Sequence, residues 1–154
     1  AATDSLTMLS QSFTPKVEFS SEFTVDPEMM TMSLISEANS IQAHPVGYAV
    51  NMYYFDEDTY IQTWQVPEDL MQKVSLWKSM DISKIQKQLY TLQIWNVKTQ
   101  TYDALESERK LILDSIDDYI TSDGKVTIKM EFINKQHGTE GQAPDIKLHG
   151  EVKK

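Results

Sequence analysis

The sequence of 154 residues contains no cysteine, and Arg109 is the only arginine among its 14 basic residues. Without cysteine the chain can form no disulfide, no thiolate metal site and no cysteine nucleophile. The net charge of −9 disfavours nucleic acid and anionic membrane surfaces as partners, because both are bound through clustered lysine and arginine side chains. We therefore expect a partner of another class.

Long apolar runs are missing as well. No stretch approaches the roughly 18 residues of a membrane span, so we expect no membrane insertion. The length allows one domain with a substantial core. The start at Ala1 and Ala2, without methionine, fits an exported chain after signal-peptide removal, and a trimmed chain is the alternative. We accordingly expect an extracytoplasmic location, secreted or at the cell surface.

The motifs of common enzymes are also absent. The three histidines, His44, His137 and His149, are not spaced as a zinc pair. There is no glycine-rich phosphate loop, serine-centred elbow or His-Glu-x-x-His motif. We predict that the chain is not an enzyme. A hydrolase built on two of the 23 acidic residues is the alternative that the sequence leaves open.

What the sequence does contain is strand alternation. Residues 16–25 place Val17, Phe19 and Phe23 on one face and polar side chains on the other, which predicts a half-buried strand. Similar patterns predict strands at residues 30–35, 46–55 and 59–66, the last two joined as a hairpin across an acidic turn. The stretch before residue 30, Asp-Pro-Glu, suits either a helix start or a turn into the next strand.

The stretch from residue 90 to 105 is central to the pattern. Leu92 and Ile94 alternate with Thr91 and Gln93, which predicts a strand, and a polar turn follows from Asn96. Further along, a turn at residue 124 leads into a predicted strand at 125–134. We expect this strand to pair with residues 146–152 as a final hairpin.

Three segments have helical features. Residues 67–80 begin with proline and acidic residues, which suit a helix start, and residues 81–88 could form another turn of helix. Residues 104–120 place apolar side chains at helical spacing, which favours an amphipathic helix.

Aromatic, turn and strand residues in the C-terminal part of the chain form an ordered pattern. It consists of Trp95, Asn96, Thr99, Tyr102, Leu105, Tyr119, Ile120, Gly124, Val126, Ile128, Asp145, Ile146 and Leu148. The pattern resembles accessory β-sandwich domains (jelly-roll, galactose-binding-like) of secreted and cell-surface microbial proteins. The resemblance implies that residues 104–120 are mostly loop and short strand, against the local helical pattern.

We therefore predict a mainly β fold, an antiparallel β-sandwich of jelly-roll type with one or two short helices. The alternative is an α+β fold with a single antiparallel sheet and two helices. Residues 1–15, rich in Ser, Thr and Gln, are predicted to be an extended arm or linker, and residues 16–154 a single domain.

Two kinds of site are suggested. Tyr53, Phe55 and Tyr60 flank the acidic turn and are candidate ligand-binding aromatics, since exposed rings stack on sugars. The three tryptophans, Trp64, Trp77 and Trp95, are expected to be core anchors.

For metal, the turn carries Asp56 and Asp58, and carboxylates are the ligands that Ca²⁺ prefers. The resemblance implies a structural calcium ion held by Asp145 and by Glu18 or Glu22. A solvated acidic surface is the simpler interpretation, and we expect no other cofactor.

These observations predict a non-catalytic, exported binding or structural module at the cell surface, with a glycan as its partner. The alternative is a subunit of a protein assembly, such as a virion, appendage or envelope complex. Such a subunit would bind another protein or form an oligomer through its N-terminal arm or its edge strands.

Overall fold

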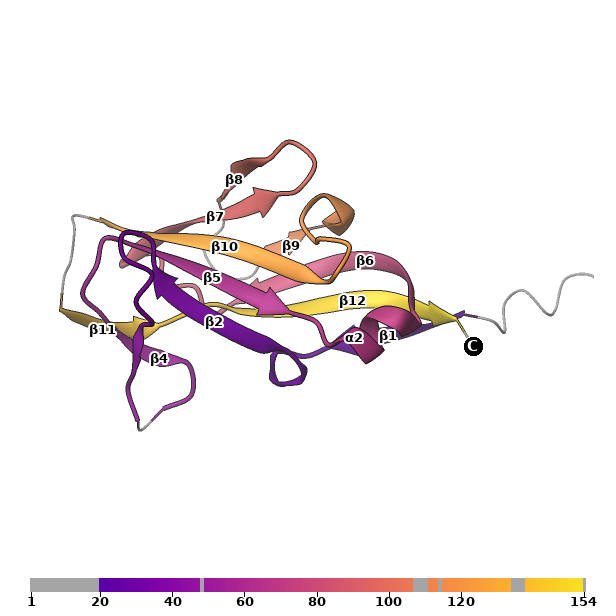
Figure 1. Cartoon of the computed structure of the whole chain (residues 1–154), viewed down its shortest axis with the longest axis horizontal. Helices are drawn as coiled ribbons and strands as arrows, with labels where there is room; N and C mark the ends of the chain where they lie inside the picture. The colour runs from indigo at the N-terminus through magenta and orange to yellow at the C-terminus, as the bar shows by residue number, and fades with distance from the viewer. Residues whose placement is uncertain (1–19, 48, 107–110, 114, 134–137, 154) are drawn as a thin grey trace, which may run out of the picture.

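Two antiparallel sheets pack face to face (Figure 1). The computed structural model describes residues 20–47, 49–106, 111–113, 115–133 and 138–153. One sheet has the order β1 (Ser20–Val25), β12 (Asp145–Lys153), β6 (Val74–Ser83) and β9 (Leu111–Leu113). The other has the order β2 (Thr31–Ser36), β5 (Thr59–Gln65), β10 (Lys125–Phe132), β7 (Tyr90–Asn96) and β8 (Thr101–Leu105). The chain crosses repeatedly from one sheet to the other, as in a jelly roll.

A third, smaller sheet lies at one end of the sandwich, to the left in Figure 1. It pairs β11 (Thr139–Gln142), β4 (Met52–Phe55) and β3 (His44–Pro45). The helical segments among the described residues are short: α2 (Glu68–Lys73) and the 3-10 turns η2 (Pro27–Met29) and η3 (Ile116–Asp118). In the described part of the chain, no helix has the length and apolar character needed to cross a membrane.

The core lies between the two large sheets and is filled from both by alternate side chains. Ile82, Ile146 and Leu148 point inward from the four-stranded sheet, and Ile94 and Ile128 from the five-stranded sheet; all are at most 1% exposed. Near the small sheet an aromatic cluster replaces the aliphatic packing. Phe132 lies 4.7 Å from Phe55, 5.9 Å from Tyr60 and 5.4 Å from Tyr90 between ring centroids.

The antiparallel β-sandwich predicted from the sequence is confirmed, and the α+β alternative is wrong. The predicted strand at 30–35 corresponds to β2, and the strand and polar turn predicted within 90–105 correspond to β7 and its turn into β8. The predicted strand at 16–25 is present from Ser20 onward, where the described residues begin. The predicted arm at residues 1–15 lies outside them.

Two of the helical predictions are wrong. The described residues within 104–120 form the end of β8, the short strand β9 and the turn η3, because Leu105 pairs with Leu92 and β9 pairs with β6. Residues 81–83 continue β6, where Ile82 pairs with Ile146 in the core, and Lys84 then turns the chain with φ 62°. Sheet pairing outweighs local helix propensity in both segments. The predicted helix at 67–80 is present only as α2.

The hairpins predicted between 46–55 and 59–66 and between 125–134 and 146–152 are also wrong. β10 pairs with β5 and β7 in one sheet, whereas β12 pairs with β1 and β6 in the other. Likewise β4 belongs to the small sheet and β5 to the five-stranded sheet. The strand predicted at 46–55 begins only at Met52, because Asn51 has φ 64° and ends the extended conformation there. Alternation identifies strands but does not select partners between two sheets.

Gly150 is required by close packing between β12 and β6. A methyl group at this position would lie 2.6 Å from the backbone oxygen of Leu76 and within 3.2 Å of the Trp77 and Phe23 rings. We expect Gly150→Ala to lower the free energy of unfolding by about 2 kcal/mol, or roughly 4–8 °C in Tm. Urea and thermal denaturation measure this change. Gly47→Ala is the control, since a methyl group there meets no atom within 4 Å; equal stability of the two variants would contradict the packing argument.

Candidate functional site

The aromatics predicted to bind a ligand do not form an exposed platform. Phe55 is 0% and Tyr60 1% exposed, so neither ring can offer a face to a ligand, and that expectation is wrong. Tyr53 is partly buried and packs against the core. Its ring lies 6.1 Å from Phe55. Burial, with a smaller effect of Asp145, raises the pKa of Tyr53.

The acidic turn before β5 is organised around a tyrosine hydroxyl. The hydroxyl of Tyr60 donates to Asp56 Oδ1 at 2.9 Å and accepts from the backbone N–H groups of Asp56 and Glu57 at 3.0 and 3.1 Å. Burial raises the pKa of Tyr60 to about 12, so the hydroxyl stays protonated and keeps its role as donor. Asp56 therefore has a structural partner in the folded chain.

Asp145, another of the residues predicted to bind calcium, forms an ion pair. Its carboxylate lies 3.0 Å from Lys84 Nζ and accepts a hydrogen bond from the Asn51 side chain. Glu18 lies outside the described residues, and Asp145, Asp56 and Asp58 are not brought together: within the described ranges, no three acidic or histidine side chains form a group that could hold a metal ion. A calcium site that includes Glu18 stays a prediction.

The outward surface of the five-stranded sheet carries two aromatic side chains that are not among the predicted ligand-binding residues. In β7 the side chains of Tyr90, Leu92 and Ile94 are buried, so the alternation turns Trp95 outward. Trp95 pairs with Tyr102 of β8, and the two rings are in edge contact with centroids 5.0 Å apart. Both side chains are partly exposed.

Polar side chains lie on the same outward surface of β7 and β10 as this aromatic pair. Lys129 pairs with Gln93 across β10 and β7, and its ammonium lies 4.5 Å from the centroid of the Tyr102 ring. The Gln93 amide donates a hydrogen bond to the carboxylate of Glu131, two residues along β10. We call the surface formed by Trp95, Tyr102, Gln93, Lys129 and Glu131 the Trp95 face.

The ionisation of the Trp95 face follows from its contacts. Burial raises the pKa of Tyr102, Lys129 lowers it and Glu37 raises it, with a net upward shift, so the phenol is neutral at physiological pH. The Lys129 ammonium is held 3.3 Å from Glu37 Oε2. The face thus combines two ring surfaces with donor and acceptor groups that are already oriented by neighbours.

The hairpin that carries Tyr102 is fixed by a network behind the sheet. Asn96 Oδ1 accepts from the backbone N–H groups of Lys98 and Thr99 at 2.9 and 3.1 Å, which closes the turn between β7 and β8. The Asn96 amide donates to Asp103 Oδ2 at 3.0 Å, and the Tyr119 hydroxyl donates to the same oxygen at 2.8 Å. Asp103 therefore ties β8 to both the turn and the segment after η3.

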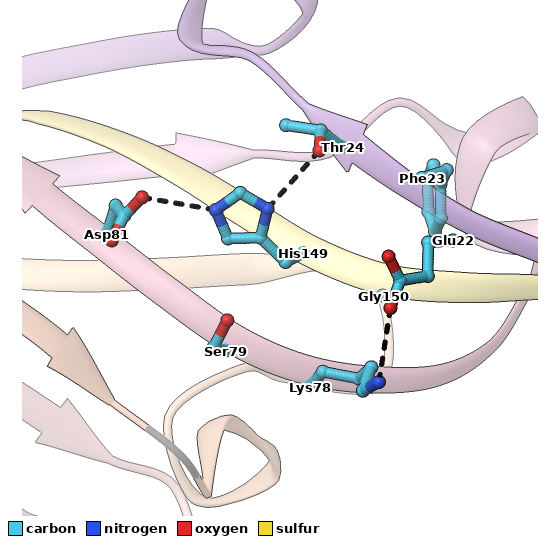
Figure 2. A pocket seen from close by; sticks show the side chains of 8 residues that line it. All are labelled: Glu22, Phe23, Thr24, Lys78, Ser79, Asp81, His149 and Gly150. Carbon is cyan, nitrogen blue, oxygen red and sulfur yellow. Dashed lines mark hydrogen bonds and ion pairs between the residues drawn. The ribbon is translucent and has the colours of Figure 1, made fainter.

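A second candidate is a polar hollow of about 380 Å³ on the four-stranded sheet (Figure 2). Its side chains come from β1, β6 and β12. His149 lies between Thr24 and Asp81, with Nδ1 3.2 Å from Thr24 Oγ1 and Nε2 3.1 Å from Asp81 Oδ2. A β-bulge in β6 leaves Lys78 without a partner residue on β12 and brings it to this surface, 3.5 Å from Glu22.

The Trp95 face is the stronger candidate. In the hollow both ring nitrogens of His149 already have partners, and the ring of Phe23 is packed against Trp77 at 5.9 Å. Polar groups have partners on both surfaces, so the rings make the difference: Phe23, the aromatic of the hollow, packs against the core. On the Trp95 face the rings of Trp95 and Tyr102 are partly exposed and are not among the side chains that pack against the core.

Comparison with known proteins gives a family. The model of a domain of unknown function, DUF8815, matches residues 10–150. The chain belongs to this family. A search of curated proteins finds no match to the DUF8815 chain.

Solved structures similar to this DUF8815 domain include several carbohydrate-binding modules. The low-affinity xylan-binding module CBM86 from Roseburia intestinalis has a TM-score of 0.40 at 13% identity, covering 87% of this chain and 95% of the module. The xylan-binding module CBM15 has a TM-score of 0.35 at 12% identity, covering 83% and 97%. A family 11 module of a Clostridium thermocellum cellulase scores 0.30 at 12% identity, covering 86% and 88%. All three TM-scores lie below 0.5.

Asp103 makes the stability of the DUF8815 domain depend on pH. Hydrogen bonds from Asn96 and Tyr119 lower the pKa of Asp103 below 3.8, its ordinary value. A lowered folded-state pKa stabilises the fold above the ordinary value, and this contribution is lost as the pH falls through the folded pKa. We expect Asp103→Asn to lower stability at pH 7 and to reduce the loss of stability between pH 5 and about pH 2. Urea denaturation across this range measures both effects. Asp69→Asn, on the exposed first turn of α2, is the control and is expected to keep the wild-type slope.

Proposed function

We propose that this domain is a non-catalytic glycan-binding module and that the Trp95 face is its binding surface. The observation that carries the proposal is the partly exposed pair of Trp95 and Tyr102, whose centroids lie 5.0 Å apart on the outer surface of a paired sheet. Sugar rings have an apolar C–H face and a rim of hydroxyl groups. Aromatic rings suit the first, and the Gln93 amide with the Glu131 carboxylate suits the second.

The angle between the two rings restricts which kinds of glycan could stack on both. The planes of Trp95 and Tyr102 differ by 67°. A flat crystalline polysaccharide surface cannot lie on both rings at once, because stacking requires nearly parallel planes. The proposed ligand is therefore a single glycan chain that can twist or present successive sugars at different angles.

A binding role without catalysis agrees with the shape of the site. Hydrolysis of a glycosidic bond uses two carboxyl groups placed on either side of the bond. The Trp95 face is one side of a sheet, so Glu131 would contact a bound chain from one direction only. Polymeric glycans occur mainly outside the cytoplasm. Because the proposed ligand is such a glycan chain, we propose an extracytoplasmic location for the domain.

A protein partner is the second candidate, supported by a different surface. Ile41, Val50 and Tyr54 are 56%, 81% and 39% exposed, in the segments that precede or form the small sheet. A protein docked on this end of the molecule would bury these apolar side chains. Tyr54 therefore offers a test that separates the two candidates.

Substitution of Trp95 is expected to remove most of the binding. Trp95→Ala deletes the larger ring of the face, and we expect a loss of about 2 kcal/mol, or roughly thirtyfold in affinity. Isothermal titration calorimetry and affinity gel electrophoresis against soluble arabinoxylan, mixed-linkage β-glucan, xyloglucan and galactomannan measure the change.

Tyr54→Ala is the matched control, an exposed aromatic away from the face. We expect this variant to bind glycans as the wild type does. Failure of the wild type to bind any of these polysaccharides, or loss of binding in Tyr54→Ala with retention in Trp95→Ala, would overturn the proposal. A change of oligomeric state in Tyr54→Ala, measured by light scattering, would favour the protein-partner candidate.

A further inference from the structure

The cation of the Trp95 face is already neutralised. Lys129 Nζ lies 3.3 Å from Glu37 Oε2, and the Lys129 side chain is 19% exposed. The same ammonium lies 4.5 Å from the centroid of the Tyr102 ring. Both contacts hold Lys129 in place, so its charge is not available to an anionic group on a ligand.

The carboxylates outnumber the cation at this surface. Glu131 is partly exposed and accepts a hydrogen bond from Gln93, whose neutral amide does not balance the charge. Lys129 contributes +1 and Glu37 and Glu131 contribute −1 each, so the group carries a formal charge of −1. Lys125, the other cation on the outward side of β10, lies 3.8 Å from Asp123. The net charge of the whole chain, −9, has the same sign as the charge of this group.

We propose that the Trp95 face selects uncharged glycan chains, and that Glu37 and Glu131 are the residues that set this selectivity. The inference rests on the proposed glycan-binding function. A carboxylate on the ligand would meet Glu131, and Lys129, the cation among the described residues of the face, is already paired with Glu37. Like charges brought together at an interface strongly disfavour binding. Uncharged hydroxyl groups can donate to Glu131 and accept from the Gln93 amide.

Glu37 and Glu131 act in different ways. Glu131 lies on the face and contacts the ligand directly. Glu37 acts through Lys129: removing its charge leaves the ammonium without its ion pair, next to the bound chain. Glu37→Gln should therefore improve binding of an acidic glycan without loss of the ring surfaces, whereas Glu131→Gln removes a repulsive charge and a strong acceptor together.

The test compares two derivatives of the same polysaccharides. Arabinoxylan, mixed-linkage β-glucan, xyloglucan and galactomannan are each substituted to the same degree with carboxymethyl groups or with hydroxyethyl groups. The substituents are similar in size but differ in charge. We expect the wild type to bind the hydroxyethyl form roughly tenfold or more tightly than the carboxymethyl form. The ratio should fall in 1 M salt, where the screening length is about 3 Å.

The variants assign this selectivity to residues. We expect Glu37→Gln to reduce the ratio several-fold by improving the affinity for the carboxymethyl form. Glu28→Gln, at an exposed position on η2, changes the net charge equally and is expected to keep the wild-type ratio.

Each other outcome has a definite meaning. Equal wild-type affinity for the two derivatives would overturn the inference and leave the glycan-binding proposal standing. An equal change of the ratio in Glu28→Gln and Glu37→Gln would assign the effect to net charge and also overturn the inference. No binding of any derivative or parent polysaccharide would contradict the proposed function itself.

Discussion

The Trp95 face exists because the strands of the five-stranded sheet alternate without interruption. In β7 and β10 every second side chain is at most 7% exposed, including Leu92, Ile94 and Phe132. Successive side chains of a strand point to opposite faces of the sheet, so the side chains between them face outward. A one-residue slip of β7 would move Trp95 into the core and Leu92 to the surface, at a large loss of apolar burial. The packing of the core therefore fixes the position of the candidate site.

The aromatic cluster adds a second constraint at the end near the small sheet. Tyr90 is 1% exposed, and its hydroxyl donates to the backbone oxygen of Gln142 at 2.7 Å. This bond ties the start of β7 to β11, while Tyr60 closes the acidic turn before β5. Buried tyrosines thus anchor loops with one end and fill the core with the other. The acidic turn resembles a metal-binding loop in composition, but hydrogen bonds to the Tyr60 hydroxyl hold its conformation.

Much of the fold could be predicted from alternation, but strand partners could not. β2, β7 and β10 follow from period-two patterns, and the Asn96 turn follows from its polar residues. The segment 104–120 was misleading because Leu105 and Ile116 fall at helical spacing by coincidence, although pairing with Leu92 places Leu105 in a sheet. Which of two sheets a strand joins depends on contacts between distant segments, and a local pattern carries no information on them.

The same alternation could also have predicted part of the candidate site. Leu92 and Ile94 were predicted to face inward and Gln93 outward, and that parity also places Trp95 outward. The usual preference of tryptophan for the core pointed the opposite way, and at this position it was misleading. Lys129 and Glu37 could not be found from the sequence, because their contact joins β10 to the loop after β2. Residue type suggests a site, but strand parity decides which side of a sheet presents it.

The proposed glycan-binding function also limits which part of a glycan the Trp95 face would recognise. The Trp95 face spans β10, β7 and β8, and its polar groups are held by neighbours before any ligand arrives. Little conformational freedom is lost there on binding, which favours affinity from a small contact area. For a ligand bound on one side of a sheet, we expect the glycan chain to continue past the face in both directions. Such a site suits the interior of a polymer, whereas recognition of a chain end requires an enclosed pocket.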